Sequence, residues 1–298
     1  MTKGVTCLLV FVAVAQGAVL RPDPPKICDS CDAWNRPLAA VRLFGNSYFV
    51  GTEGLGAVLV SSANGHVLLD GGLPQSASRI EENIRKAGFT LEDVRLILNS
   101  HAHYDHAGGI AALQRASGAQ VAASEWGARV LERGETLEDD PQHGLGREAM
   151  SLPPVTKVRV VRDGEVLRVA DIAITARLTP GHTPGSTTWT WQSCEGSRCL
   201  DVVYADSLNA VSAAGFRFTG NGSRGDLIAA FRQSIATVRD LPCDVLVTVH
   251  PQFARLEQKL ARRAANPKVN PFIDPTSCRS YADDAMKRLV ARIAEERR

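Results

Sequence analysis

The feature that most constrains this chain is a short run of three histidines and one aspartate directly after an apolar, strand-like segment. The segment is Val94–Leu98, and the run is His101-Ala102-His103-Tyr104-Asp105-His106. Side chains two apart on an extended backbone point the same way, whereas the Asp-His pair must belong to a turn and can face elsewhere. Imidazole nitrogens and carboxylate oxygens are ligands that suit zinc. Because four such groups cannot all serve one metal that must also hold water and ligands from elsewhere in the chain, the run predicts two adjacent metals.

The alternative interpretation of the run is a solvated polar turn between a strand and a helix. The chain has only seven histidines in 298 residues. Three of them within six positions therefore favour a metal site over a chance cluster.

The N-terminus has the pattern of a secretory signal peptide. Lys3 supplies a positive start, residues 5–14 are nearly all apolar, and Ala13-Val14-Ala15 resembles a cleavage site. The apolar stretch is too short to cross about 30 Å of hydrocarbon. We expect cleavage after Ala15, or else Gly17, and export to the periplasm with no membrane attachment afterwards.

Removal of this segment takes Cys7 away and leaves six cysteines, an even number that favours disulfides in an exported protein. Cys194 and Cys199 flank a tight turn between two strand ends and can bridge locally. Cys243 begins a strand and Cys278 a helix, so a bridge would pin the last helix to the sheet. Cys28 and Cys31 remain as a short third loop, and their pairing stays open. The alternative, a four-cysteine zinc site, is disfavoured because the chain has one C-x₂-C pair.

Composition and charge are those of an ordinary globular protein. Hydrophobic residues make up 44% and charged residues 22% of the chain, and the formal net charge is +2. This balance gives no case for a nucleic-acid partner. The length allows one large domain or two smaller ones, and the sequence does not indicate the oligomeric state.

The order of apolar segments predicts an α/β fold. We expect an irregular segment over 16–40 and then one domain over 41–298. Its strands are expected at 44–50, 56–61, 66–69, 94–98, 119–122, 157–162, 165–169, 172–178, 187–191, 200–204 and 245–249. Its helices are expected at 76–86, 110–116, 125–133, 226–239, 253–264 and 281–296.

In each half of this domain the strands come first and the helices after. That order predicts an αββα sandwich, in which two sheets pack face to face with helices outside. The metal ligands would lie on loops at one edge, between the halves. Residues 134–154 are read as a long loop, and such loops are commonly functional.

Two more histidines stand where further ligands are wanted. His182 lies on a turn rich in Pro and Gly, Thr179-Pro180-Gly181-His182-Thr183-Pro184-Gly185-Ser186, and His250 ends the apolar strand at 245–249. Together with the first run, these blocks resemble the metallo-β-lactamase superfamily from about Trp34 to the C-terminus. Within it, the chain is most similar to the third subclass of class B β-lactamases. The further blocks that carry this likeness are Trp34-Asn35-x-Pro37, Gly45-Asn46-Ser47-Tyr48, Leu69-Asp70-Gly71-Gly72 and Ala205-Asp206-Ser207-Leu208.

The resemblance implies two Zn²⁺ ions, one held by His101, His103 and His182, the other by Asp105, His106 and His250. It implies a hydrolase that opens the β-lactam amide of penicillin-, cephalosporin- or carbapenem-type antibiotics through attack of a zinc-bound hydroxide. Asp105 would also orient that hydroxide.

The resemblance also suggests roles outside the ligand set. Asp70 would hold a ligand imidazole by its other N–H, the alternative being a cap on the Gly-Gly turn. Ser207 rather than Asp206 is expected to face the metals or the substrate, with Asp206 structural. Asn209 stands where Ser or Thr is usual, and it can still bind a substrate carboxylate. His143, in the long loop, is a candidate substrate contact.

Other functions share these motifs. A hydrolase of the same fold could act on a lactone or a thioester, and a non-catalytic zinc-binding module would keep the fold without the activity. His66 follows an Asn-Gly turn and is expected to face solvent. No ligand of the implied set is missing, so we expect an enzyme.

Overall fold

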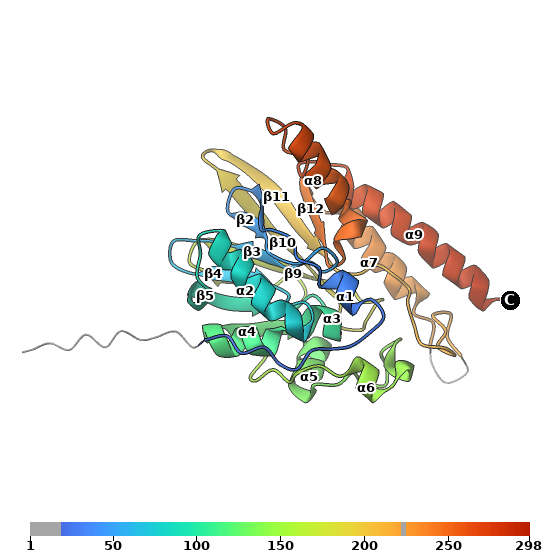
Figure 1. Ribbon diagram of the computed structural model, residues 1–298. Helices are drawn as coiled ribbons and strands as arrows, with labels where there is room; N and C mark the ends of the chain where they lie inside the picture. Colours follow the sequence, from blue (N-terminus) through green and yellow to red (C-terminus); the bar gives the residue numbers. More distant parts are fainter. Residues whose placement is uncertain (1–18, 222–224) are drawn as a thin grey trace, which may run out of the picture.

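The computed structural model describes residues 19–221 and 225–298, and in them two sheets lie face to face between helices (Figure 1). The predicted signal peptide lies outside the described residues. The first sheet contains, in spatial order, β1 (Val41–Phe44), β2 (Ser47–Phe49), β3 (Val58–Val60), β4 (His66–Leu69), β5 (Val94–Leu98), β6 (Gln120–Ser124) and β7 (Arg159–Val161). The second contains β12 (Val245–Thr248), β11 (Arg198–Ala205), β10 (Thr187–Glu195), β9 (Ile172–Leu178) and β8 (Val166–Val169).

Helices connect the parallel strands of both sheets. From β4 to β7 neighbouring strands run parallel, as do β11 and β12, and a parallel pair needs a crossover connection. The α-helices are α1 (Cys31–Trp34), α2 (Ala77–Lys86), α3 (Tyr104–Ala107), α4 (Ile110–Ser117), α5 (Glu125–Arg133), α6 (Arg147–Met150), α7 (Ile228–Asp240), α8 (Leu256–Ala265) and α9 (Ser277–Glu296). Short 3₁₀ turns are η1 (Pro74–Ser76), η2 (Leu91–Asp93), η3 (His143–Leu145) and η4 (Pro251–Ala254).

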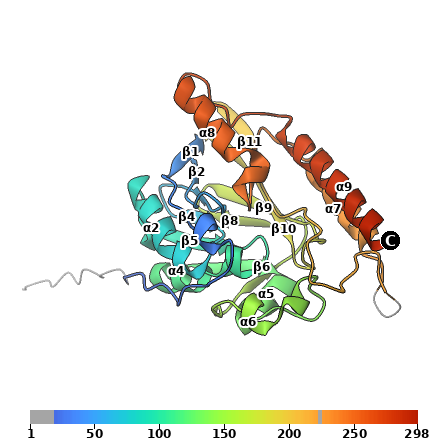
Figure 2. The ribbon, with the colours of Figure 1, turned by 45° about the vertical axis from the view of Figure 1, so that its right-hand side comes forward.

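Both faces of each sheet are buried, which makes the four layers of the fold. Successive strand residues point to opposite faces. Leu68 accordingly packs with the helices of the first half, whereas Leu69 packs between the sheets. In the second sheet Val202 faces the first sheet and Val203 faces α7 and α9. Figure 2 shows α2 and α4 on one side and α7 and α9 on the other. The predicted αββα sandwich is confirmed.

The predicted bounds of β4, β5, α5 and β9 match the structure, and several other predictions are corrected. The strand predicted at 157–162 for the second half is β7, which pairs with β6 in the first sheet. α1 lies in the segment predicted irregular, and η3 and α6 lie in the predicted long loop. His66 is buried against Phe89, with ring centroids 5.0 Å apart, instead of facing solvent. These differences depend on long-range pairing and packing that local periodicity does not report.

The expected disulfides Cys194–Cys199 and Cys243–Cys278 are present, and Cys28 is bonded to Cys31, the pairing that the sequence left open. Cys194 and Cys199 are direct cross-strand partners on β10 and β11. Cys243–Cys278 ties α9 to the chain just before β12. Since these six cysteines are all paired, they form no four-cysteine zinc site.

Within residues 19–221 and 225–298, none of the helices is both long and apolar enough to cross a bilayer.

Candidate metal centre

The histidine run is held in place by close backbone contact between two Gly-Gly pairs. The Gly71 N–H donates to the His106 carbonyl at 2.8 Å, and the Gly109 N–H donates to the Gly72 carbonyl at 3.1 Å. A Cβ added at Gly109 would lie 2.3 Å from the Gly71 carbonyl oxygen. No side chain fits there, so glycine is what lets the loop after β5 lie against the loop after β4.

The backbone of the run explains how its ligands diverge. His103 is extended (φ −90°, ψ 154°), and the one-turn helix α3 begins at the next residue. His101 and His103 therefore precede the helix, while Asp105 and His106 lie on it. The predicted change from extended segment to turn is confirmed.

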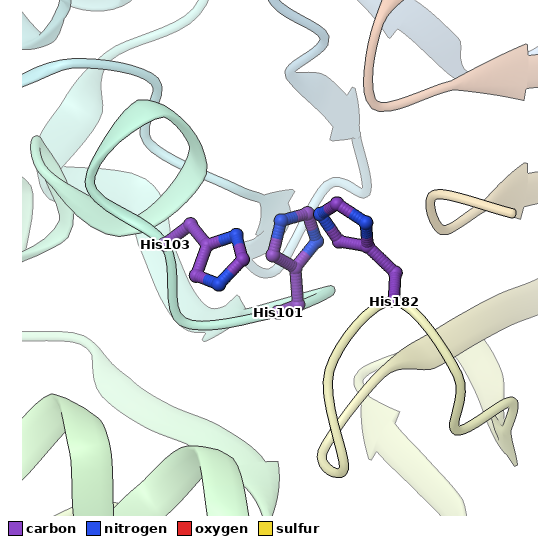
Figure 3. Close-up of side chains that lie close together, drawn as sticks. All are labelled: His101, His103 and His182. Atoms are coloured by element: carbon purple, nitrogen blue, oxygen red, sulfur yellow. The ribbon is translucent and has the colours of Figure 1, made fainter. Parts of the chain in front are cut away.

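Loops after two further strands, β9 and β12, bring the remaining histidines to the same place. His182 lies between β9 and β10, and His250 follows β12. Figure 3 shows His182 reaching from its loop towards His101 and His103. The ring centroids of His101 and His103 lie 4.8 Å apart, and that of His182 lies 4.7 Å from His101 and 5.1 Å from His103.

These side chains form two adjoining groups that can hold metal ions. His101, His103 and His182 form one, and His101, Asp105 and His106 form the other, with all potential ligand atoms of a group within 4.8 Å of one another. His250 joins the second group, because its Nε2 lies 3.4 Å from Asp105 Oδ2 and its ring centroid 4.7 Å from that of His106. The sequence prediction thus names side chains that the fold brings together.

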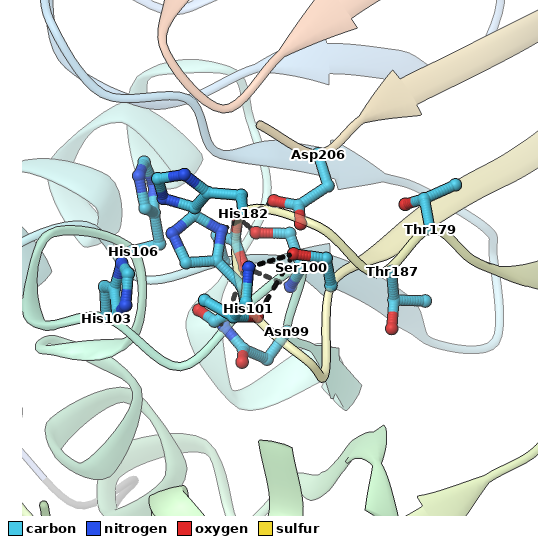
Figure 4. Close-up of polar contacts among 12 residues, drawn as sticks. Asn99, Ser100, His101, His103, His106, Thr179, His182, Thr187 and Asp206 are labelled. Carbon is cyan, nitrogen blue, oxygen red and sulfur yellow. Dashed lines mark hydrogen bonds and ion pairs between the residues drawn. The ribbon is translucent and has the colours of Figure 1, made fainter. Parts of the chain in front are cut away.

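In four of the imidazoles one nitrogen is held by an acceptor, which leaves the other for a metal. His101 Nδ1 lies 2.6 Å from Asp206 Oδ1, and His103 Nε2 lies 2.9 Å from Asp140 Oδ2 (Figure 4 labels both histidines and Asp206). The Nδ1 atoms of His182 and His250 lie 2.9 Å and 3.2 Å from the carbonyl oxygens of Asn209 and Gly54. Such partners fix the tautomer and orientation of metal-bound histidine.

Buried nitrogens without partners test whether the cluster fits zinc. Among the described residues, His101 Nε2 and both ring nitrogens of His106 make no hydrogen bond, although all three are buried. A buried polar atom without a partner is costly. Zinc would take His101 Nε2 and one ring nitrogen of His106 as ligands, so the residues fit the metal that the resemblance implies.

The protonation states also suit metal binding. Burial lowers the pKa of His101 well below its usual range, and His106 and His103 lower it further. Burial likewise lowers the pKa values of His106 and His182. Burial opposes ionisation of Asp105, yet His106 and His250 hold the pKa of Asp105 well below its usual range. His101, His106 and His182 therefore lie in the cluster as neutral imidazoles and Asp105 as an anionic carboxylate, the forms that bind metals.

The other predicted site residues lie at different depths. Asp206 is buried behind His101, and Ser207 beside it is also buried. Asn209 contributes its backbone carbonyl to His182, and its side chain is half-buried. His143 is exposed on η3, where it lines a surface pocket with Arg129, Arg133 and Arg147 rather than joining the cluster.

Asp70 does not contact a histidine, so the expected bond to a ligand imidazole is wrong. Its carboxylate accepts hydrogen bonds from the Ser100 N–H (2.8 Å) and hydroxyl (2.6 Å), from Asn99 Nδ2 (3.0 Å) and from the Tyr204 hydroxyl (2.8 Å). Burial raises the pKa of Asp70 to about 7 against these opposing donors. Asp70 thus supports the histidine run through the backbone that precedes His101.

Asp140 is a site residue that the sequence analysis missed. It lies in the loop predicted to be functional, and its carboxylate accepts from Thr136 Oγ1 and the Gln142 N–H, each at 2.7 Å. Burial alone would lower the pKa of His103, but the Asp140 carboxylate next to His103 Nε2 outweighs burial and raises this pKa. The sequence feature that could have identified Asp140 is its position as a carboxylate in the loop expected to be functional, where it could accept a hydrogen bond from a ligand histidine.

We expect Asp140→Asn to weaken zinc binding by about 10-fold or more, since partners of ligand histidines typically account for 10–100-fold in affinity. Competition with a chromophoric chelator measures the change. Asp139→Asn is the matched control, because Asp139 accepts a hydrogen bond from Trp126 Nε1 at 2.8 Å and not from a proposed zinc-binding histidine. An Asp140→Asn protein with unchanged zinc affinity would contradict this role for Asp140.

Comparison with known proteins agrees with the fold and the cluster. A family model for the metallo-β-lactamase superfamily matches residues 41–194, and the chain belongs to that superfamily. Among solved structures, the chain is similar to the Rm3 metallo-β-lactamase at 49% identity, covering 92% of this chain and 100% of that chain with a TM-score of 0.87. It is also similar to MEM-A1, a subclass B3 metallo-β-lactamase isolated from a soil metagenome library, at 48% identity, 88% and 98% coverage and a TM-score of 0.84.

Among curated proteins the similarity is more distant. The acyl-coenzyme A thioesterase MBLAC2 of Gallus gallus is 28% identical over 102 residues, which is 30% of this chain and 35% of that protein. The chain therefore matches only about a third of the length of this relative.

Proposed function

We propose that this protein is an exported dizinc β-lactamase that opens the β-lactam amide of penicillin-, cephalosporin- and carbapenem-type antibiotics. The observation that carries the proposal is the match to subclass B3 enzymes over nearly the whole length of both chains. The thioesterase match covers a third of that relative. The similarity thus includes the segments outside the shared metal motif, and these segments are the ones that differ between enzymes with different substrates.

The contacts support three protein ligands for each zinc. His101, His103 and His182 would hold one ion, and Asp105, His106 and His250 the other. Asp206 is supported as a residue that positions a ligand, because its Oδ1 atom already lies against His101 Nδ1. Three ligands per zinc leave a coordination position open, as catalysis requires.

Bound zinc supplies Lewis acidity and lets water act as a nucleophile near neutral pH. Asp105 is ionised in the cluster and can accept a hydrogen bond from the attacking water, which sets the direction of that water. The water oxygen would bond to the lactam carbonyl carbon as the C–N bond breaks, one proton of that water would pass to the ring nitrogen, and the other would be released as the new carboxyl group ionises. The product is a single ring-opened molecule that carries both a carboxylate and an amine.

Substrate binding is proposed for the segment that follows Asp206. Ser207 and Asn209 border the cluster, since Asp206 contacts His101 and the Asn209 carbonyl contacts His182. Their side chains can donate hydrogen bonds to the carboxylate that β-lactam antibiotics carry. Trp34, whose ring centroid lies 5.3 Å from that of His250, adds an apolar wall.

Export is proposed from the signal-like sequence of the first residues. The three disulfides agree with it, because disulfides persist in oxidising compartments such as the periplasm.

A substrate panel tests the proposal. With the mature, zinc-loaded protein, we expect kcat/KM for nitrocefin and a carbapenem within the enzymatic range of roughly 10⁴–10⁸ M⁻¹s⁻¹. We expect values at least about 100-fold lower for an acyl-homoserine lactone and an acyl-coenzyme A thioester, a difference of roughly 3 kcal/mol in transition-state binding. Faster turnover of the lactone or thioester would replace the lactamase proposal. A protein with two zinc ions that turns over none of the four would be a binding module.

A further inference from the structure

A second polar pocket lies apart from the metal centre, between η4, the start of α8 and the first turns of α9. It encloses about 140 Å³. The side chains that line the pocket and carry its charge are Arg255, Lys259, Asp274, Asp284 and Arg288. None of them belongs to the proposed zinc ligands.

Two cations in the wall of this pocket lack the partners that buried charges normally have. Lys259 is only 7% exposed, and its Nζ makes no hydrogen bond within the described residues. Arg288 likewise has its Nε and one terminal nitrogen buried without an acceptor in that part of the chain, although its guanidinium lies 4.9 Å from the centroid of the Phe253 ring. Buried charges are costly unless they are paired.

The carboxylates of the pocket are already engaged elsewhere. Asp274 Oδ1 accepts from the Thr276 N–H at 3.0 Å and the Thr276 hydroxyl at 2.7 Å. Asp284 pairs with Lys287 at 2.8 Å. Three cationic side chains thus face two carboxylates that have other partners, which leaves an excess of positive charge around the cavity.

The start of α9 adds to this positive potential. Thr276, Ser277 and Ser280, which form the N-cap and the first turn of α9, also line the pocket. The N-terminus of a helix favours anions, because its first N–H groups have no partner within the helix and its dipole is positive there. The helix end and the unpaired Lys259 point independently to the same kind of ligand.

We propose that this pocket binds a small oxyanion between Lys259, Arg288 and the first turn of α9. Its volume suits sulfate, inorganic phosphate or a small carboxylate rather than a drug-sized molecule, which needs about 300 Å³ or more. The anion would accept charge-assisted hydrogen bonds from Lys259 Nζ and the Arg288 guanidinium. Burial lowers the pKa of Lys259 although the negative charge of Asp274 opposes this, which agrees with a buried ammonium group whose hydrogen-bonding capacity is unused.

The pocket adjoins the metal centre without including it. Tyr281, in its wall, donates its hydroxyl to the Asp206 carbonyl at 2.8 Å and accepts from the Leu208 N–H at 3.0 Å. Sulfate can also bind at the zinc site. The experiment must therefore separate the two places by variants of the pocket alone.

Equilibrium dialysis of radiolabelled sulfate against the zinc-loaded, full mature chain tests the proposal. We compare the native protein with Lys259→Met, which removes the charge and keeps an apolar side chain, and with Arg288→Met. Lys268→Met is the matched control, since Lys268 is an exposed lysine in the segment after α8. Competition by phosphate and by acetate then distinguishes tetrahedral oxyanions from carboxylates.

We expect a sulfate site in the native protein and in Lys268→Met that is at least about tenfold weaker in Lys259→Met and Arg288→Met, whereas any sulfate held at the zinc centre is the same in all four proteins. Lys259→Met is expected to fold, because loss of a buried unpaired charge does not destabilise. Thermal unfolding checks this and should show a smaller sulfate-induced rise in Tm for Lys259→Met than for Lys268→Met. Equal sulfate affinity in Lys259→Met and the native protein, or an equal loss in Lys268→Met, would overturn the proposal.

Discussion

His106→Ala should lower nitrocefin hydrolysis by more than about 100-fold, beyond the 10–100-fold that partners of ligand residues account for. His106 is fully buried, and neither ring nitrogen has a hydrogen-bond partner among the described residues, while Nε2 lies 3.1 Å from Asp105 Oδ2. Without a bound metal, the imidazole of His106 therefore makes no hydrogen bond that would stabilise the fold. We expect bound zinc to fall from two ions per chain to one, as measured by elemental analysis beside the rate.

His66→Ala is the control for this experiment. His66 is also a buried histidine, but it packs on Phe89 and accepts from the Ser62 N–H at 3.3 Å, outside the cluster. It should keep two zinc ions and its activity. Retention of two zinc ions and full activity by His106→Ala would refute the ligand assignment. EDTA should remove the activity of the native protein, and added zinc should restore it.

Removal of the Cys243–Cys278 disulfide should produce the largest loss of stability among the three bridges. The bridge closes a loop with a sequence separation of 35. On the chain-entropy model such a loop contributes about 3–4 kcal/mol, because the cross-link restricts the unfolded chain. Cys243→Ala/Cys278→Ala should therefore lower the free energy of unfolding by that amount, measured by urea denaturation under non-reducing conditions.

The Cys194–Cys199 bridge provides the comparison. Its sequence separation is 5, and its two cysteines are already cross-strand partners in the β10–β11 hairpin. The same model gives it about 2 kcal/mol. A loss for Cys194→Ala/Cys199→Ala equal to or larger than that for the longer loop would show that loop entropy does not set the order. Free thiols at all six positions in exported protein would contradict the pairing itself.

Local pattern predicted most of the elements correctly, and its failures share one cause. α5 and β9 have the predicted bounds, because each has its own periodicity and its own turn residues at the ends. The strand at β7 was predicted, but its sheet was not, since parallel pairing with β6 depends on a connection through α5 and the following loop. His66 was expected in solvent because burial against Phe89 involves a residue 23 positions away.

The sequence by itself determined which side chains can bind metal and how the histidine run divides. Ligand chemistry belongs to the residue type, and the change from extended backbone to turn between His103 and Asp105 is local. Only the tertiary structure decided which group holds each ligand. Asp140 behind His103 and Asp206 behind His101 lie 37 and 105 residues from their partners. The tertiary structure also decided the partners of Asp70, which accepts hydrogen bonds from Ser100 and Tyr204 and not from the expected ligand imidazole. Hydrogen bonds of 2.6–2.9 Å between such distant residues are set by the packing of the strands that carry them, and no spacing in the sequence reports it.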